Sequence, residues 1–219
     1  MTPCDRKTRK CGNFLVLVAM LLWGARALKA EAASNFPVGE ITSVSRVAVA
    51  VRDGKQTELA PGDKVYEFDF ILTGHLGGAV VRLGDGTEVE MSADSGIAIV
   101  NYVFSPDKAL LQLNFERGSS VVRTGGIGLK NPKGLKLVTP RTHINASNAD
   151  LEITITPVAE TLAIRRLPAG PQVLVFGTMS KDLADIRKEG STVVTDAAGD
   201  MTVYLPGELP EEGQEEETD

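Results

Sequence analysis

The chain has 219 residues, of which 42% are hydrophobic and 24% charged, and its formal net charge at pH 7 is −6. The excess of carboxylates repels phosphate backbones and anionic lipid headgroups, which argues against nucleic acid binding and tight binding to a membrane surface. The length is sufficient for one hydrophobic core, so we expect one domain with short flanking segments.

The first 32 residues have the layout of a secretory signal peptide. Four basic side chains lie within residues 6–10, the ten residues from Phe14 to Trp23 are all apolar, and an alanine-rich segment follows. This apolar run is short for a membrane span, which needs about 20 residues. The sequence therefore predicts a Sec-type signal peptide over residues 1–32, cleaved between Ala32 and Ala33, and export to the periplasm or cell surface. An uncleaved N-terminal anchor is the alternative.

Cleavage would change the composition of the chain. It would remove six of the 23 basic and two of the 29 acidic side chains, which leaves 187 residues with a net charge of −10. Cys4 and Cys11 would leave with the same segment, so the exported chain could form no disulfide. The domain would then be held by its apolar core alone.

Short strands separated by glycine-bearing turns fill the chain from residue 41 to residue 205. Apolar and polar residues alternate in Val47–Val51, Thr87–Met91 and Leu151–Thr156. Turn sequences such as Asp53-Gly54 and Asp85-Gly86 lie between the strands. We expect an all-β, mostly antiparallel fold, either a sandwich or a solenoid-like stack of hairpins, preceded by a signal helix. Residues 33–40 are predicted as a linker, 41–205 as the domain and 206–219 as an acidic, disordered tail.

Three segments carry more local predictions. Ser180–Gly190 has a capping serine and a closing glycine, which favours a short helix. Gly125–Gly128 contains three glycines without the lysine of a phosphate loop, which favours a flexible hairpin tip. Tyr66, Phe68 and Phe70 alternate as on one strand face, which indicates core positions.

The sequence offers no constellation for catalysis or metal binding. His75 and His143 are far apart, and are better explained as a loop residue and a solvent-facing strand residue than as zinc ligands. Ser95 fits a turn rather than a nucleophile elbow. Glu88 and Glu90 are better explained as solvent-facing residues of one strand than as an acid–base pair. We therefore expect a protein that is not an enzyme, with no cofactor, no metal and no catalytic residue.

The order of several small motifs resembles the FecR domain of bacterial envelope proteins. The motifs are Leu59–Asp63 (LAPGD), Asp69–Thr73 (DFILT), Ala79–Val89 (AVVRLGDGTEV), Leu113–Gly118 (LNFERG) and Thr139-Pro140. The resemblance implies structural turn residues, which are Gly62, Asp63, Asp69, Thr73, Asp85, Gly86, Thr87, Thr139 and Pro140. It identifies no ligand-binding residue.

The resemblance is incomplete after Thr139-Pro140. The family commonly continues with Arg-Gly-Thr, whereas this chain reads Arg141-Thr142-His143. Signalling members also carry a cytoplasmic helical segment before the apolar run, and about thirteen residues precede it here. We expect an exported, FecR-like binding module whose partner is an envelope protein or glycan. The alternatives are a structural or adhesive β protein that assembles at the cell surface, and a signalling regulator if the N-terminal segment is an uncleaved anchor.

Overall fold

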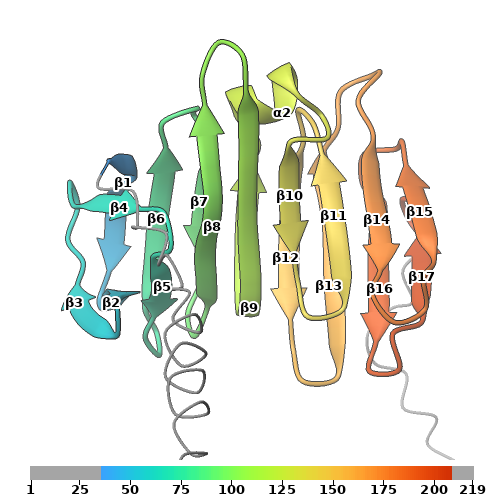
Figure 1. Ribbon diagram of the computed structural model, residues 1–219. Helices are drawn as coiled ribbons and strands as arrows, with labels where there is room; N and C mark the ends of the chain where they lie inside the picture. The colour runs from blue at the N-terminus through green and yellow to red at the C-terminus, as the bar shows by residue number, and fades with distance from the viewer. Residues whose placement is uncertain (1–35, 209–219) are drawn as a thin grey trace, which may run out of the picture. The chain divides into compact units, whose positions relative to one another are not determined.

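The computed structural model describes residues 36–208, which form 17 strands and one short helix (Figure 1). The prediction of an all-β, mainly antiparallel fold is confirmed. The predicted signal helix, the predicted cleavage residues Ala32 and Ala33, and residues 209–219 of the predicted tail lie outside the described residues. No helix within residues 36–208 is long and apolar enough to cross a membrane.

Nine strands form the first sheet, called sheet A. Neighbouring strands are antiparallel throughout this sheet. From one edge to the other they are β4 (Lys64–Tyr66), β1 (Pro37–Ser45), β6 (Gly78–Leu83), β7 (Glu88–Met91), β9 (Ala109–Arg123), β12 (Asp150–Ile155), β13 (Ala159–Arg166), β16 (Thr192–Asp196) and β17 (Met201–Tyr204).

The second sheet, sheet B, also has nine strands and shares β9 with sheet A. Its strands are antiparallel except for the pair β9 and β10, which is parallel. In order they are β3 (Lys55–Glu58), β2 (Ala48–Arg52), β5 (Phe70–Thr73), β8 (Gly96–Phe104), β9, β10 (Leu135–Val138), β11 (Thr142–Ala146), β14 (Val173–Gly177) and β15 (Leu183–Ile186).

Strand β9 joins the two sheets because it bends at Gly118. Its first half pairs with β8 and β10 in sheet B, and its second half pairs with β7 and β12 in sheet A. Gly118 has a φ of +82°, and a Cβ there would lie 2.3 Å from Ser95 Oγ. Only glycine fits both the backbone conformation and the space. The sequence pattern predicts two strands here, 109–115 and 120–123, where the structure has one bent strand.

The hairpins of the second half alternate between the sheets. The hairpin β10–β11 lies in sheet B, β12–β13 in sheet A, β14–β15 in sheet B and β16–β17 in sheet A. Figure 1 shows the two layers one in front of the other. The sandwich and the solenoid-like stack of hairpins, which the sequence leaves as alternatives, are therefore two descriptions of one architecture.

The predicted helix at Ser180–Gly190 is wrong, because Leu183–Ile186 is strand β15 and pairs with β14. An isolated helix of this length is marginal, and pairing with an existing sheet edge buries Ala184 and Ile186. The glycines at 125–128 do not form a hairpin tip: helix α2 (Gly126–Lys130) begins there. Phe68 has a φ of +69° and is exposed in a turn, so Tyr66, Phe68 and Phe70 do not share a strand face.

The core lies between the two sheets. One continuous cluster of buried apolar side chains extends from Val38 to Val193 and draws on both layers. Isoleucine, leucine and valine dominate it, as expected of packed strand faces. Within residues 36–208, the hydroxyl of Ser191 is the one buried side-chain polar atom without a hydrogen-bond partner. The other buried polar side chains must therefore be explained by the groups that they bind.

Candidate functional site

Asp85 and Thr87, two of the predicted turn residues, hold the segment that crosses from sheet A to sheet B. Thr87 Oγ1 donates to Asp85 Oδ2 at 2.8 Å, and the Ile127 N–H of helix α2 donates to the same oxygen at 3.0 Å. The Gly125 N–H donates to Thr87 Oγ1 at 3.0 Å. A Cβ at Gly125 would lie 2.3 Å from the Thr87 nitrogen. The glycines that look like a phosphate loop therefore serve this close backbone contact.

Asp69 is fully buried and forms the centre of a second turn. Its carboxylate accepts hydrogen bonds from Arg52 Nε at 2.5 Å and Nη2 at 2.7 Å, and from the Tyr66 N–H at 2.8 Å. The Arg52 guanidinium also lies over the Tyr66 ring, 3.9 Å from its centroid. The hydrogen bond to the Asp69 carboxylate is the main cause that raises the pKa of the Arg52 guanidinium. A bidentate pair of this kind orients both side chains.

Gly86, Thr73 and the Gly62-Asp63 pair are the other predicted turn residues of the first half. Gly86 has a φ of +85°, and Thr73 is the last residue of strand β5. Thr73 Oγ1 donates to the Ser92 carbonyl at 2.6 Å and accepts from the Ser95 N–H at 2.9 Å. Asp63 Oδ2 accepts from the Ala60 N–H at 2.8 Å, in a turn where Gly62 has a φ of +95°. Each side chain replaces a partner that the backbone lacks in a turn.

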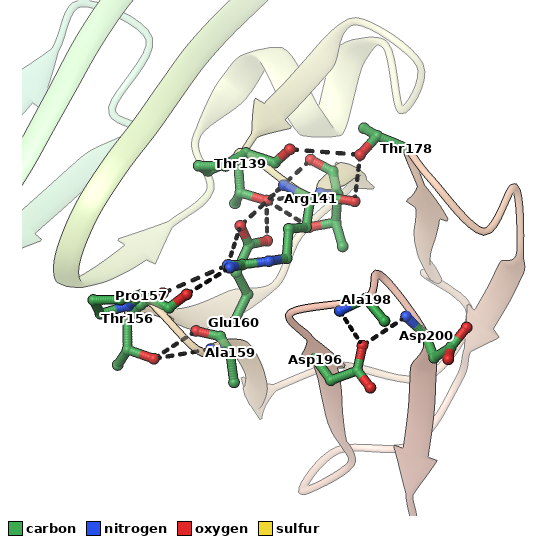
Figure 2. A network of polar contacts seen from close by, with 12 residues as sticks. Thr139, Arg141, Thr156, Pro157, Ala159, Glu160, Thr178, Asp196, Ala198 and Asp200 are labelled. Carbon is green, nitrogen blue, oxygen red and sulfur yellow. Dashed lines mark hydrogen bonds and ion pairs between the residues drawn. The ribbon is translucent and has the colours of Figure 1, made fainter.

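A polar cluster in the second half is formed around Thr139, Arg141 and Glu160 (Figure 2). Thr139 Oγ1 accepts from the Thr142 N–H at 2.9 Å and donates to Glu160 Oε2. Glu160 Oε1 accepts from the Arg141 N–H at 2.9 Å and lies 3.5 Å from Arg141 Nη1. Glu160 is only 4% exposed and belongs to β13 of sheet A, whereas the turn belongs to sheet B. The cluster therefore ties the two layers together.

Several residues of these clusters are missing from the sequence-based predictions. Glu160 could have been found, because it is in phase with the apolar residues Leu162 and Ile164 on β13 and so faces the core. Arg52 carries no such signal, since its partner Asp69 is distant in sequence and the two meet only in the fold. Ser95, expected in a turn, is buried and bonds the backbone of Ser119 across the bend of β9.

A groove of about 760 Å³ lies at one edge of the sandwich, between edge strands β3 and β4. In the described part of the chain, β3 pairs only with β2 and β4 only with β1, so the outer edge of each strand has no strand partner. Ala50 and Leu59 are buried at the groove, and Arg52 stacks on Tyr66 beside them. The remaining lining residues are Asp53, Lys55, Thr57, Gly62, Asp63 and Lys64.

The residues considered for chemistry do not converge on one centre. His75 is exposed and lies 2.9 Å from the exposed Asp94, and His143 is exposed on β11. Glu88 lies on the outer face of sheet A, where Arg82 and Arg123 lower its carboxyl pKa, the hydrogen bond from Arg82 most of all. Across residues 36–208, no three His, Cys, Asp or Glu side chains gather as metal ligands would.

Comparison with known proteins gives low similarity. No family model matches the chain, and no curated protein matches it. Two crystal structures described as a candidate anti-sigma factor from Parabacteroides distasonis ATCC 8503 are similar, at 12% and 13% identity and TM-scores of 0.48 and 0.49. In both cases 64% of this chain is aligned, and it spans 60% of the length of the other chain.

Proposed function

We propose that this protein is an exported, FecR-like, non-enzymatic binding module of the bacterial envelope, and that it binds a protein partner at the groove between β3 and β4. The observation that carries the proposal is the groove itself, which lies between two strands whose outer edges have no strand partner among the described residues. Export rests on the signal-like segment 1–32, and the FecR resemblance on the turn motifs.

The groove suits an extended polypeptide. Main-chain N–H and C=O groups along a free strand edge can pair with an added strand, and the side chains beside the edge then select its sequence. Here Lys55 and Thr57 of β3 lie on one side, and Lys64 and Tyr66 of β4 on the other. Arg52 is held in place by Asp69, so part of the binding surface is preorganised.

The buried polar side chains of the turns are engaged within the scaffold. Asp69, Thr73, Asp85, Thr87 and Thr139 direct their oxygens to backbone amides or neighbouring side chains of the turns. These bonds engage the side chains of these five residues, so none of the five is a free nucleophile or general base. The turns therefore act as supports for a rigid scaffold.

A photo-crosslinking amino acid placed at Thr57, within the groove, tests the proposed binding site. Thr202, an exposed residue of edge strand β17, provides the matched control position. In the native host, we expect one envelope protein to be crosslinked from position 57 and not from position 202, and the yield to fall when Lys55→Glu is added. Equal capture from both positions, or none from position 57, would contradict the proposal.

Export is tested separately by the mass of the protein in the envelope fraction. A chain that begins at Ala33 is the expected product. A full-length chain that stays in the cytoplasm would contradict export and leave the groove to be tested by itself.

A further inference from the structure

Helix α2 and the loop between β8 and β9 lie at the same end of the sandwich (Figure 1). The two elements are in contact. Lys130 Nζ at the end of α2 donates to the carbonyl oxygens of Ser105 and Pro106 in the loop. A Cβ added at Gly126 of the same helix would lie 3.0 Å from the ring of Phe104. The loop and the helix therefore form one continuous surface.

This surface is basic although the described chain is acidic. Of the 23 basic and 29 acidic side chains, 17 and 21 lie within residues 36–208. The exposed lysines of the surface come from the loop, from α2 and from the segment that follows it, and they are Lys108, Lys130, Lys133 and Lys136. None of them is in an ion pair within the described residues. They outnumber the carboxylates beside them, which are Asp107 in the loop and Asp85 below α2.

The neighbouring loops at this end carry no charge. They are 147–149, between β11 and β12, and 167–172 (LPAGPQ), between β13 and β14. The register places them here, because Asp150 at the start of β12 pairs with both Arg123 and Arg166. At the opposite end of the strands, the exposed residues include four acids and two bases, which are Asp94, Asp182, Asp196, Asp200, Arg46 and Lys181.

Two large apolar side chains stand among the lysines. Phe104 at the end of β8 is 46% exposed, and Leu129 of α2 is 63% exposed. Exposed apolar side chains beside lysines are typical of surfaces that rest on a membrane. The apolar groups enter the boundary between headgroups and acyl chains, while the lysines attract anionic headgroups. A bilayer also needs no pocket to receive a projecting loop, and Figure 1 shows the β8–β9 loop projecting beyond the strands.

The chain enters the domain at this same end. The Gly84 N–H donates to the Val38 carbonyl at 2.9 Å, and the Gly126 N–H donates to the Asp85 carbonyl at 2.8 Å. The start of β1 therefore lies beside the turn that holds α2. Segment 1–32, which the sequence predicts to target the chain to a membrane, is joined to the domain on the side of this surface.

We propose that this end of the sandwich binds the surface of a bilayer that contains anionic phospholipids. Its binding residues are Phe104, Lys108, Leu129, Lys130, Lys133 and Lys136, together called the basic tip. The net charge of the whole chain argues against such binding, but charges act in solution only within about 8 Å at physiological ionic strength. A strand of six residues is ~20 Å long, so the acidic residues of the opposite end are screened from a surface at the tip.

The basic tip is separate from the groove between β3 and β4. In sheet B, β2 and β5 lie between β3 and β8. The groove lies at the sheet edge and the tip at the end of the strands. Binding of a protein partner at the groove and binding of a bilayer at the tip can therefore be lost one without the other.

Co-sedimentation with vesicles tests the proposal, using the protein purified from the envelope fraction. We expect binding to vesicles of phosphatidylethanolamine with about 30% phosphatidylglycerol, and none to phosphatidylcholine vesicles. The double variant Lys108→Glu/Lys133→Glu should bind at least roughly 20-fold more weakly, because each lysine near an anionic surface contributes about fivefold. Neither lysine side chain makes a hydrogen bond within the described residues, so the fold should be kept.

The control is Arg46→Glu/Lys181→Glu, which makes the same change of charge at the opposite end of the strands. We expect its affinity for the anionic vesicles to stay within about twofold of that of the unaltered protein. An equal loss in the two double variants would overturn the proposal, because net charge alone would then explain binding. Failure of the unaltered protein to bind the vesicles, or binding to polyglutamate in their place, would also overturn it.

A fluorescent label gives a second readout that does not depend on how the glutamate variants fold. In a background with Cys4→Ser and Cys11→Ser, a polarity-sensitive dye is attached at Leu129→Cys or, as the control, at Lys181→Cys. Anionic vesicles should shift the emission to shorter wavelength at position 129 and leave it unchanged at position 181. Equal shifts at both positions, or no shift at position 129, would overturn the assignment of the tip.

Discussion

The two outer faces of the sandwich differ although the two inner faces are alike. Both sheets supply isoleucine, leucine and valine to one core. Outside, sheet A carries ion pairs such as Arg82 with Glu88. Sheet B carries one uncharged row of register partners, which are Val51, Phe70, Ala98, Asn114, Val138, His143, Phe176 and Leu183. Exposed ion pairs add little stability, so the charges of sheet A are better understood as keeping that face in water. The two outer faces therefore differ in their charge, although the core between the sheets is shared.

Both sheets depend on the bend of β9, so a change at Gly118 should have the largest effect. The variant Gly118→Ala would strain a residue with a φ of +82° and place its Cβ against Ser95. We expect a loss of about 3 kcal/mol in the free energy of unfolding, measured by urea denaturation. Gly62 also has a positive φ, but no atom lies within 4 Å of an added Cβ there. Gly62→Ala should therefore lower the free energy of unfolding by only about 1 kcal/mol. Equal losses would show that the contact with Ser95 does not matter.

The next largest loss of stability is expected at the segment that connects sheet A to sheet B and is held by Asp85. Asp85→Ala removes the acceptor of the Thr87 hydroxyl and of the Ile127 N–H, and leaves these donors buried without a partner. We expect a loss of roughly 2–3 kcal/mol by thermal or urea unfolding. Asp107→Ala, at an exposed residue of the β8–β9 loop, should stay within about 0.5 kcal/mol. A loss at Asp85 no larger than the loss at Asp107 would contradict the assigned role.

Alkaline pH should reveal a contribution of Tyr102, a residue of β8 in sheet B. Burial, followed by the charge of Asp85, raises the pKa of the Tyr102 phenol from 10.0 to about 12. The unfolded chain loses this proton first, so stability is full below pH 10 and falls as the pH rises toward 12. The loss should approach roughly 2 kcal/mol in unfolding measurements between these pH values. In the variant Tyr102→Phe, the free energy of unfolding should depend less steeply on pH in this range. An unchanged slope would contradict the assigned contribution of Tyr102.

The smallest effect is expected on the charged face of sheet A. Arg123→Gln removes the ion pairs with Glu88 and Glu90, and should cost less than about 1 kcal/mol. Because the arginines lower the pKa of Glu88, their contribution is present above the ordinary carboxyl pKa and is lost as the pH falls through the lowered value. The cost should also shrink in 1 M salt. The control is Arg117→Gln, at an exposed residue of β9 for which the described region shows no ion pair. A similar loss of stability in this control would show that the ion pairs of Arg123 contribute nothing.

The sequence by itself determined the fold class and most strand positions. Period-two alternation is decided by local residue order, and the turns are marked by glycine, proline and aspartate. For this reason Thr87–Met91 and Leu151–Thr156 were predicted nearly as the structure has them, at Glu88–Met91 and Asp150–Ile155. In sheet A, the alternation also distinguished the residues that face the core from those that face solvent.

Only the tertiary structure decided which strands meet and what the turn residues bind. The bend at Gly118, the strand at Leu183–Ile186 and the contact of Gly125 with Thr87 all depend on segments far apart in the chain. The uncharged row of sheet B depends in the same way on the register of eight strands. The sequence of one strand does not identify the strand that it pairs with, because each strand presents the same backbone N–H and C=O groups to any partner.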